Sequence, residues 1–134
     1  MPKKPRMTID DHLDRMEKNE EFFNKLLQED DPHKDWIIII EFYTALHGVD
    51  SVLLKLGASD YRLGKHESRN EEVDVRLPGK ISKAYTNLFT MSIFLRYERP
   101  KNHTISEQSL NHYISTWNDV IKPYVLAEMG QTNL

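Results

Sequence analysis

The stretch WIIIIEFYTALHGVDSVLLKLG, from Trp36 to Gly57, decides the fold class of this chain. Its run of isoleucines has the β-branched composition of a strand. However, only Gly48 interrupts the segment between Pro32 and Leu56, which is far longer than a typical strand of about 5–6 residues. Asp31 and Pro32 suit a helix start, and Gly57 suits a helix end. Apolar side chains recur along it at helical spacing: Trp36, Ile39 or Ile40, Tyr43, Leu46, Leu53 and Leu54. We therefore predict one long, mostly buried helix over 32–56.

Two further segments, one on each side of this helix, have the periodicity of amphipathic helices. Residues 8–29 open with Thr8 and Asp11, which have the spacing of a capping box. Residues 79–98 carry an apolar stripe and end before Pro100, since the residue before a proline avoids helical geometry. Both segments are expected to pack against the 32–56 helix.

A fourth helix is predicted over 104–128. Thr104 and Glu107 match a capping box, and Pro123 is expected to kink its last part. Residues 57–79 interrupt the pattern and are predicted to form a short helix or an ordered loop. The fold class that follows is all-α, an up-and-down antiparallel four-helix bundle.

Length and composition support a single domain covering residues 1–134, with 1–7 as a flexible N-terminus. Hydrophobic residues make up 39% of the chain, enough for a core, and the net charge is −3, so there is no general basic field for nucleic acid. The chain contains no Cys, which excludes disulfides and thiolate chemistry. No apolar run resembles a secretory signal or a membrane span, so we expect a cytoplasmic protein with no membrane contact.

His47 and Asp50 are predicted to lie on one face of the 32–56 helix, which is its apolar face. One interpretation is that Asp50 orients the imidazole, as carboxylates do at metal or catalytic sites. The other is a buried polar pair, satisfied by neighbouring groups, that mainly sets packing. No metal site is predicted, because no two histidines have helical ligand spacing. No cofactor is expected.

Two polar clusters lie outside the apolar stripes. In the first, His66 and Arg69 could hold a phosphate, although nearby acidic residues oppose that charge. The second extends from Arg96 to His103 and also contains Arg99 and Lys101. Its catalytic interpretation is RNA cleavage, with His103 moving a proton and Arg96 stabilising phosphate charge. Its structural interpretation is a set of cations that complement a helix C-terminus.

The order of these features resembles the HEPN-domain superfamily over about residues 32–128. The helix FYTALHGVDSVLLKLG is followed by a loop with His66, then by Leu95-Arg-Tyr97, and then by a last helix after Thr104. The resemblance implies a dimeric helical bundle. Many such proteins are ribonuclease toxins paired with a nucleotidyltransferase-like antitoxin, and their active site is an Arg and a His with four to six residues between them. Arg96 and His103 meet that spacing, but Tyr97 occupies a position where the family favours a polar residue.

We therefore expect a non-catalytic HEPN-like binding or assembly domain. It would work as a homodimer, beside a nucleotidyltransferase-like partner or with RNA or a nucleotide. The alternatives are a metal-independent HEPN ribonuclease that uses Arg96 and His103, as the toxin of a toxin–antitoxin pair, and a structural bundle for protein contacts. The phosphate-binding candidates are His66, Arg69, Arg99 and Lys101.

Overall fold

The computed structural model describes residues 7–130, and this part of the chain is all-α with no strand. Three short segments adjoin the α-helices. One is the 3₁₀ turn η1 (Asp60–Gly64), and the other two are π-helical, η2 (Phe94–Glu98) and η3 (Thr116–Ile121). Because η2 continues α4, and η3 joins α5 to α6, the described residues form five helical rods. The α-helices are α1 (Ile9–Leu27), α2 (Lys34–Lys55), α3 (His66–Arg76), α4 (Gly79–Ile93), α5 (Glu107–Ser115) and α6 (Lys122–Glu128).

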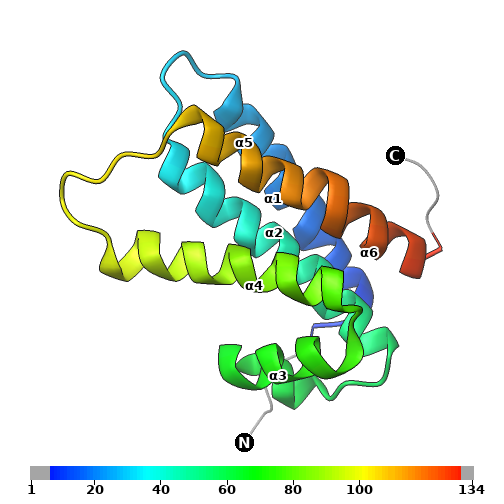
Figure 1. The fold of residues 1–134 in the computed structure, drawn as a ribbon. Helices are drawn as coiled ribbons and strands as arrows, with labels where there is room; N and C mark the ends of the chain where they lie inside the picture. The colour runs from blue at the N-terminus through cyan, green and yellow to red at the C-terminus, as the bar shows by residue number, and fades with distance from the viewer. Residues whose placement is uncertain (1–6, 131–134) are drawn as a thin grey trace, which may run out of the picture.

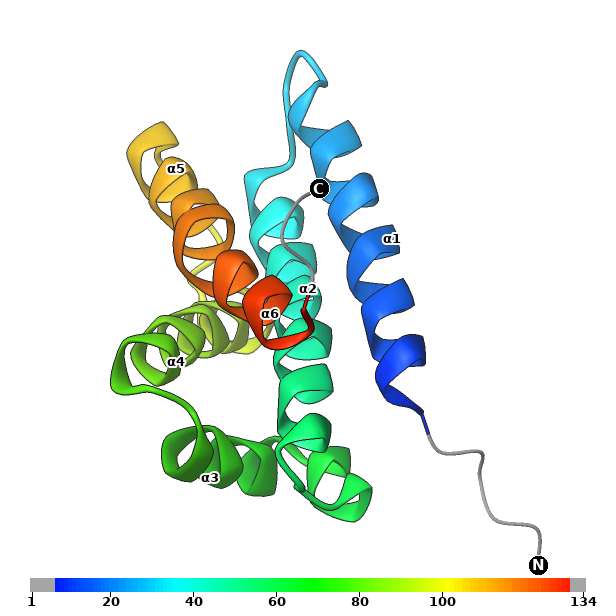
Figure 2. The same ribbon diagram turned by 90° about the vertical axis from the view of Figure 1, so that its right-hand side faces the viewer.

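Helix α2 lies at the centre of the fold, which confirms that the isoleucine-rich stretch is a buried helix. Helix α1 runs antiparallel beside it along most of its length (Figures 1 and 2). Helix α4 packs on another side of α2, as does the rod formed by α5, η3 and α6. The largest fully buried side chains include Trp117, Tyr85, Phe23 and Phe42, one from each of these four rods. Burial of these aromatic rings supplies much of the driving force for folding.

The capping box at the start of α1 is confirmed. The Thr8 hydroxyl accepts from the Asp11 amide at 3.1 Å, and the Asp11 carboxylate accepts from the Thr8 amide at 2.9 Å. Both bonds satisfy backbone donors that have no partner inside the helix.

Two predicted helix starts are wrong by two or three residues. Helix α2 begins at Lys34 after His33, so Asp31 does not cap it and Pro32 is not in its first turn. Helix α5 begins at Glu107 rather than 104, because the Ser106 hydroxyl accepts from the Ser109 amide at 3.0 Å. Ser106 is thus the capping residue, and it competes successfully with Thr104.

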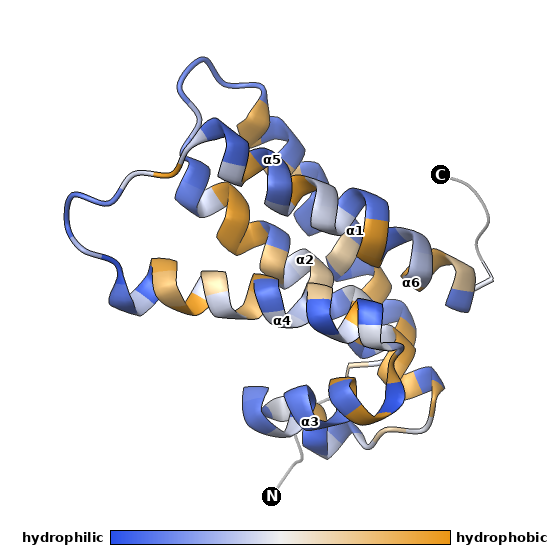
Figure 3. Cartoon of the chain, viewed as in Figure 1, coloured by the Kyte–Doolittle hydropathy of each residue, from blue (hydrophilic) through white to orange (hydrophobic). Residues whose placement is uncertain are grey.

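The interruption between 57 and 79 contains the helix α3, which was predicted only as one of two options. Helix α3 is mostly hydrophilic and lies at one end of the molecule, beyond the end of α2 (Figures 1 and 3). Its buried residues are Arg69 and Val73, and Arg69 anchors it to α2.

Near the C-terminus, Pro123 lies in the first turn of α6, directly after the π-helical η3. The expectation of a flexible N-terminus falls on residues 1–7, and residues 1–6 lie outside the described part.

Helix α2 is long and apolar enough to cross a membrane, with a mean hydropathy of 1.6 over its most apolar window. However, 78% of that window is buried inside the protein. The core helix of a globular protein has the same length and composition, so this feature is weak evidence on membrane contact.

Candidate anion-binding site

Arg96 in η2 is a half-buried cation held in place by neutral partners. Its Nη1 donates to the Tyr43 hydroxyl at 2.7 Å, and its Nε donates to the Ser92 carbonyl at 3.2 Å. Its Nη2 donates to the Ser92 hydroxyl at 3.3 Å. The guanidinium also lies over the rings of Tyr43 and Tyr97, at 5.4 and 5.1 Å from their centroids. These contacts fix its position without cancelling its charge.

No carboxylate pairs with Arg96 among residues 7–130, although most arginines there do form ion pairs. Arg99 pairs with Asp35 at 2.9 Å, and Arg69 pairs with Asp50 at 2.8 Å. A positioned cation without a counter-ion suits an anionic ligand, and its planar fork matches a phosphate.

His66 lies at the start of α3, and the positive charge of Arg96 affects its pKa. Burial lowers the pKa of His66, and the charges of Arg69 and Arg96 lower it further. Its Nδ1 lies 3.2 Å from Nη1 of Arg69. Because a guanidinium only donates, Nδ1 must accept, which leaves a neutral imidazole with its proton on Nε2. The ring packs near Phe42 and Phe89, with centroids 6.1 and 5.4 Å away.

The position of His66 depends on a buried ion pair behind it. Arg69 donates from Nε to Asp50 Oδ1 at 2.8 Å and from Nη2 to Asp50 Oδ2 at 3.1 Å, and Nη2 also reaches the Leu63 carbonyl. Asp50 is 1% exposed. Burial raises the pKa of Asp50 to about 6, although Arg69 opposes the shift. The charge of Arg69 is therefore used inside the protein and is not free for a ligand.

A hollow of about 480 Å³ between α1 and α2 shares Tyr43 with this cluster, and Arg15 and His47 also line it. His47 contacts His12 of α1, with the two Nδ1 atoms 2.9 Å apart. The charge of Arg15 lowers the pKa of His47, after the larger effects of burial and of His12. The hollow thus places a second arginine, Arg15, in the surroundings of Tyr43.

The structure separates several residues that the sequence analysis grouped. His47 and Asp50 bond to different partners, His12 and Arg69, rather than to each other. Arg96 and His103 form no hydrogen bond with each other in the described chain. Instead, the His103 ring stands edge-on against Phe94 at 5.0 Å and lines a different hollow, with Arg99.

The four phosphate-binding candidates lie in different surroundings. His66 lies beside Arg69 and near Arg96, whereas Arg69 and Arg99 are occupied by carboxylates. Lys101 is exposed in the turn after η2. Within residues 7–130 there is no group of three potential metal ligands.

Tyr43, Ser92 and Arg15 belong to this region, but the sequence analysis did not assign them to a site. The spacing of Tyr43 and His47, four residues apart on one helix, was a usable signal for a shared face. Nothing in the sequence indicated that η2 would fold back against that face. Comparisons with protein-family models, with curated proteins and with solved structures found no match to this chain.

Proposed function

We propose that this chain is a HEPN-like binding domain that takes the phosphate group of a nucleotide or RNA at Arg96, Tyr43 and His66, without cleaving it. In this proposal α1, α2, α4 and the α5–α6 rod are the four helices of an up-and-down bundle, and α3 is an addition. The observation that carries the proposal is the half-buried Arg96, which is fixed by two tyrosines and has no carboxylate partner in the described chain.

The neighbouring groups support an anion at this place. His66 offers an Nε2–H donor, and the Tyr43 hydroxyl can donate to a ligand while it accepts from Arg96. The tyrosine rings provide stacking surface for a base, and Tyr97 is 73% exposed. The overall charge of −3 gives little general attraction for RNA, so binding should depend on this local cluster.

The test is fluorescence anisotropy with a short single-stranded RNA and a labelled nucleotide. The Arg96→Gln variant should weaken binding at least about tenfold, the loss expected for one charge-assisted contact. Lys83→Gln, which removes an exposed cation from α4, is the control for net charge and should bind like the parent. Equal binding by Arg96→Gln and the parent would refute the proposal.

A metal-independent ribonuclease is a second candidate, and a specific observation changes its catalytic pair. The charge of Arg96 lowers the pKa of His66, whereas the His103 ring stands edge-on against Phe94. Cleavage in the presence of chelator should therefore be lost in His66→Ala and Arg96→Ala and kept in His103→Ala. Cleavage that is lost in His103→Ala but kept in His66→Ala would restore the pair that the sequence spacing suggested.

Dimerisation, a nucleotidyltransferase-like partner and a cytoplasmic location remain part of the proposal. Trp36 and Phe22 are 56% and 52% exposed, which supports a covered apolar surface. Phe42, by contrast, is fully buried in the core and gives no support to such a surface. Light scattering at micromolar concentration tests the dimer directly.

A further inference from the structure

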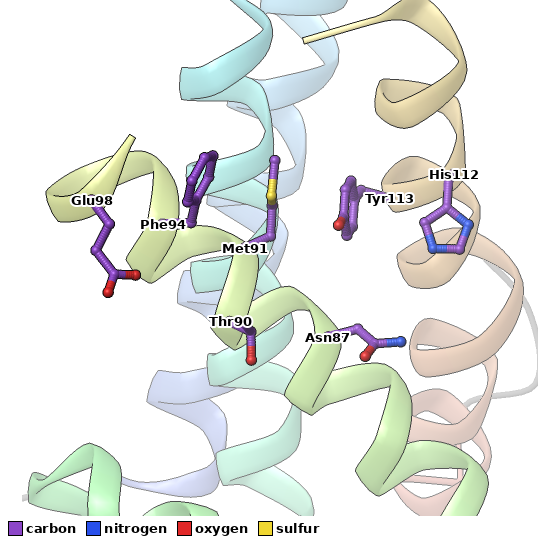
Figure 4. A pocket seen from close by; sticks show the side chains of 7 residues that line it. All are labelled: Asn87, Thr90, Met91, Phe94, Glu98, His112 and Tyr113. Atoms are coloured by element: carbon purple, nitrogen blue, oxygen red, sulfur yellow. The ribbon is translucent and has the colours of Figure 1, made fainter. Parts of the chain in front are cut away.

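Another hollow lies between the α4–η2 rod and α5. Its volume is about 520 Å³. The side chains that line it are Asn87, Thr90, Met91, Phe94, Glu98, His112 and Tyr113 (Figure 4). The groove exists because α4 packs against η3, while α5 diverges from α4 toward the connection formed by residues 99–106 (Figure 1).

The floor of the groove is apolar and aromatic. Met91, Phe94 and Tyr113 extend into the space between the two rods (Figure 4). His103 stands edge-on against Phe94 at 5.0 Å, and His112 does the same against Tyr113 at 5.1 Å. Phe94 and Tyr113 are therefore each held in position by contact with a histidine ring.

The acidic group of the groove is Glu98, and no cation neutralises it within the described residues. The neighbouring arginines point to other partners: Arg96 to Tyr43 and Arg99 to Asp35 at 2.9 Å. Among the described residues, the groove is lined by no lysine or arginine, and its one histidine, His112, lies at the other end from Glu98. Thus the aromatic floor carries a carboxylate at one end that has no counter-ion.

Phe94 and Glu98 are the first and last residues of the π-helical η2. The Arg99 amide bonds to the Phe94 carbonyl at 2.8 Å, an i to i+5 bond that widens this turn. Widened turns of this kind are frequent at functional sites, because they change which side chains face one side of a helix. Here the ring and the carboxylate line the same groove, while Arg96, between them, faces Tyr43 of α2.

We propose that this groove binds a small organic cation with an apolar body, an alkyl- or arylammonium or a guanidinium compound. Glu98 is the counter-ion, and the faces of Phe94 and Tyr113 provide the cation–π contact. Thr90 and Asn87 offer hydrogen-bond acceptors at the rim. An anionic ligand is disfavoured by Glu98, which separates this site from the anion-binding cluster around Arg96.

Three probes of nearly equal shape test the charge preference: phenethylammonium, 2-phenylethanol and 3-phenylpropionate. Binding is followed by amide chemical-shift changes in the full-length protein at neutral pH. Phenethylammonium should shift the amides of α5 and of the groove residues of η2, and bind at least about fivefold tighter than the alcohol, whereas the anion should not shift the amides of the groove residues. Equal binding of the cation and the alcohol, or no binding by the cation, would overturn the proposal.

Two variants locate the site. Glu98→Gln should strongly reduce the preference for the cation, with only the cation–π contact left, and should leave the affinity for the alcohol unchanged. The matched control is Glu21→Gln, which should keep the preference. Glu21 is an exposed residue of α1 and forms no ion pair in the described chain. Tyr113→Leu should weaken both uncharged and cationic probes. If Glu21→Gln and Glu98→Gln reduce cation binding equally, the attraction is general and the assigned groove is wrong.

Discussion

Arg69 of α3 and Asp50 of α2 form a two-pronged ion pair, with N–O distances of 2.8 and 3.1 Å, in the interior of the protein. The pair crosses from the hydrophilic helix α3 to the core helix α2. Arg69 also contacts His66 and the Leu63 carbonyl. A single guanidinium therefore fixes the end of η1, the start of α3 and the imidazole of the candidate site.

Removal of one member of this pair should be strongly destabilising. Arg69→Met leaves the Asp50 carboxylate buried without a partner, and we expect a loss of about 3–5 kcal/mol in the free energy of unfolding. The double variant Asp50→Leu/Arg69→Met should recover much of that loss, because no buried charge is left. Urea denaturation measures both effects. Lys18→Met, which removes an exposed ion pair with Asp14, is the control and should cost at most about 1 kcal/mol.

The contact between His12 and His47 makes stability depend on pH. Burial lowers the pKa of His47 to about 4, with further contributions from His12 and two arginines. The folded state therefore binds fewer protons than the unfolded state between about pH 6.5 and 4, and stability falls as the pH drops through this range. Asp50, with its pKa raised to about 6, acts in the opposite direction over part of the range.

Comparison of the parent with His47→Gln isolates the histidine contribution, because glutamine keeps a hydrogen-bonding group but does not titrate. The parent should lose about 1–3 kcal/mol more than the variant between pH 7 and pH 4. Thermal and urea unfolding at several pH values give this difference. Parallel pH profiles for the two proteins would show that the His12–His47 contact does not titrate as described.

Glu41 is a carboxylic acid inside the core, and its two oxygens have no hydrogen-bond partner in the described structure. Burial raises the pKa of Glu41 to about 9, so the folded protein holds a proton there that the unfolded chain releases. Stability from this group is present below about pH 4.5 and is lost as the pH rises through 9. Glu41→Gln should therefore raise the free energy of unfolding at pH 8 by about 1–3 kcal/mol, with little change near pH 4. The exposed Glu21→Gln should change neither value.

The all-α class was predictable because helical period and helix breakers are local properties of the sequence. The buried helix α2 and the capping box of Thr8 with Asp11 both appear in the structure, although Trp36 of the predicted stripe is exposed and burial extends around most of α2. The helix starts near Pro32 and Thr104 were predicted less well, because several residues in a row can cap, and tertiary contacts choose among them. One such contact is the bond from Lys34 to the Ile105 carbonyl at 3.2 Å, which joins the two helix starts.

The site was harder to predict because its members meet only through tertiary packing. Arg96 and Tyr43 are 53 residues apart, yet they share a 2.7 Å hydrogen bond. The pairing of Arg96 with His103 rested on their spacing along the chain. Spacing gives no indication that the turn after η2 would place His103 on Phe94, or that α3 would bring His66 toward the arginine.

Gly48 gives the last prediction, because it marks the close approach of α2 to two other rods. A Cβ atom at this position would lie 3.0 Å from the Met16 sulfur and 3.2 Å from Val125 Cγ2. Gly48→Ala gains up to about 1 kcal/mol in helix propensity, but the crowding of α1 and α6 should exceed that gain and destabilise the protein by about 1 kcal/mol overall. Gly79→Ala is the matched control, since nothing lies within 4 Å of its Cβ position and the change should be neutral or stabilising. Thermal unfolding of both variants measures the difference, and a Gly48→Ala variant more stable than the parent would show that Met16 and Val125 move aside without cost.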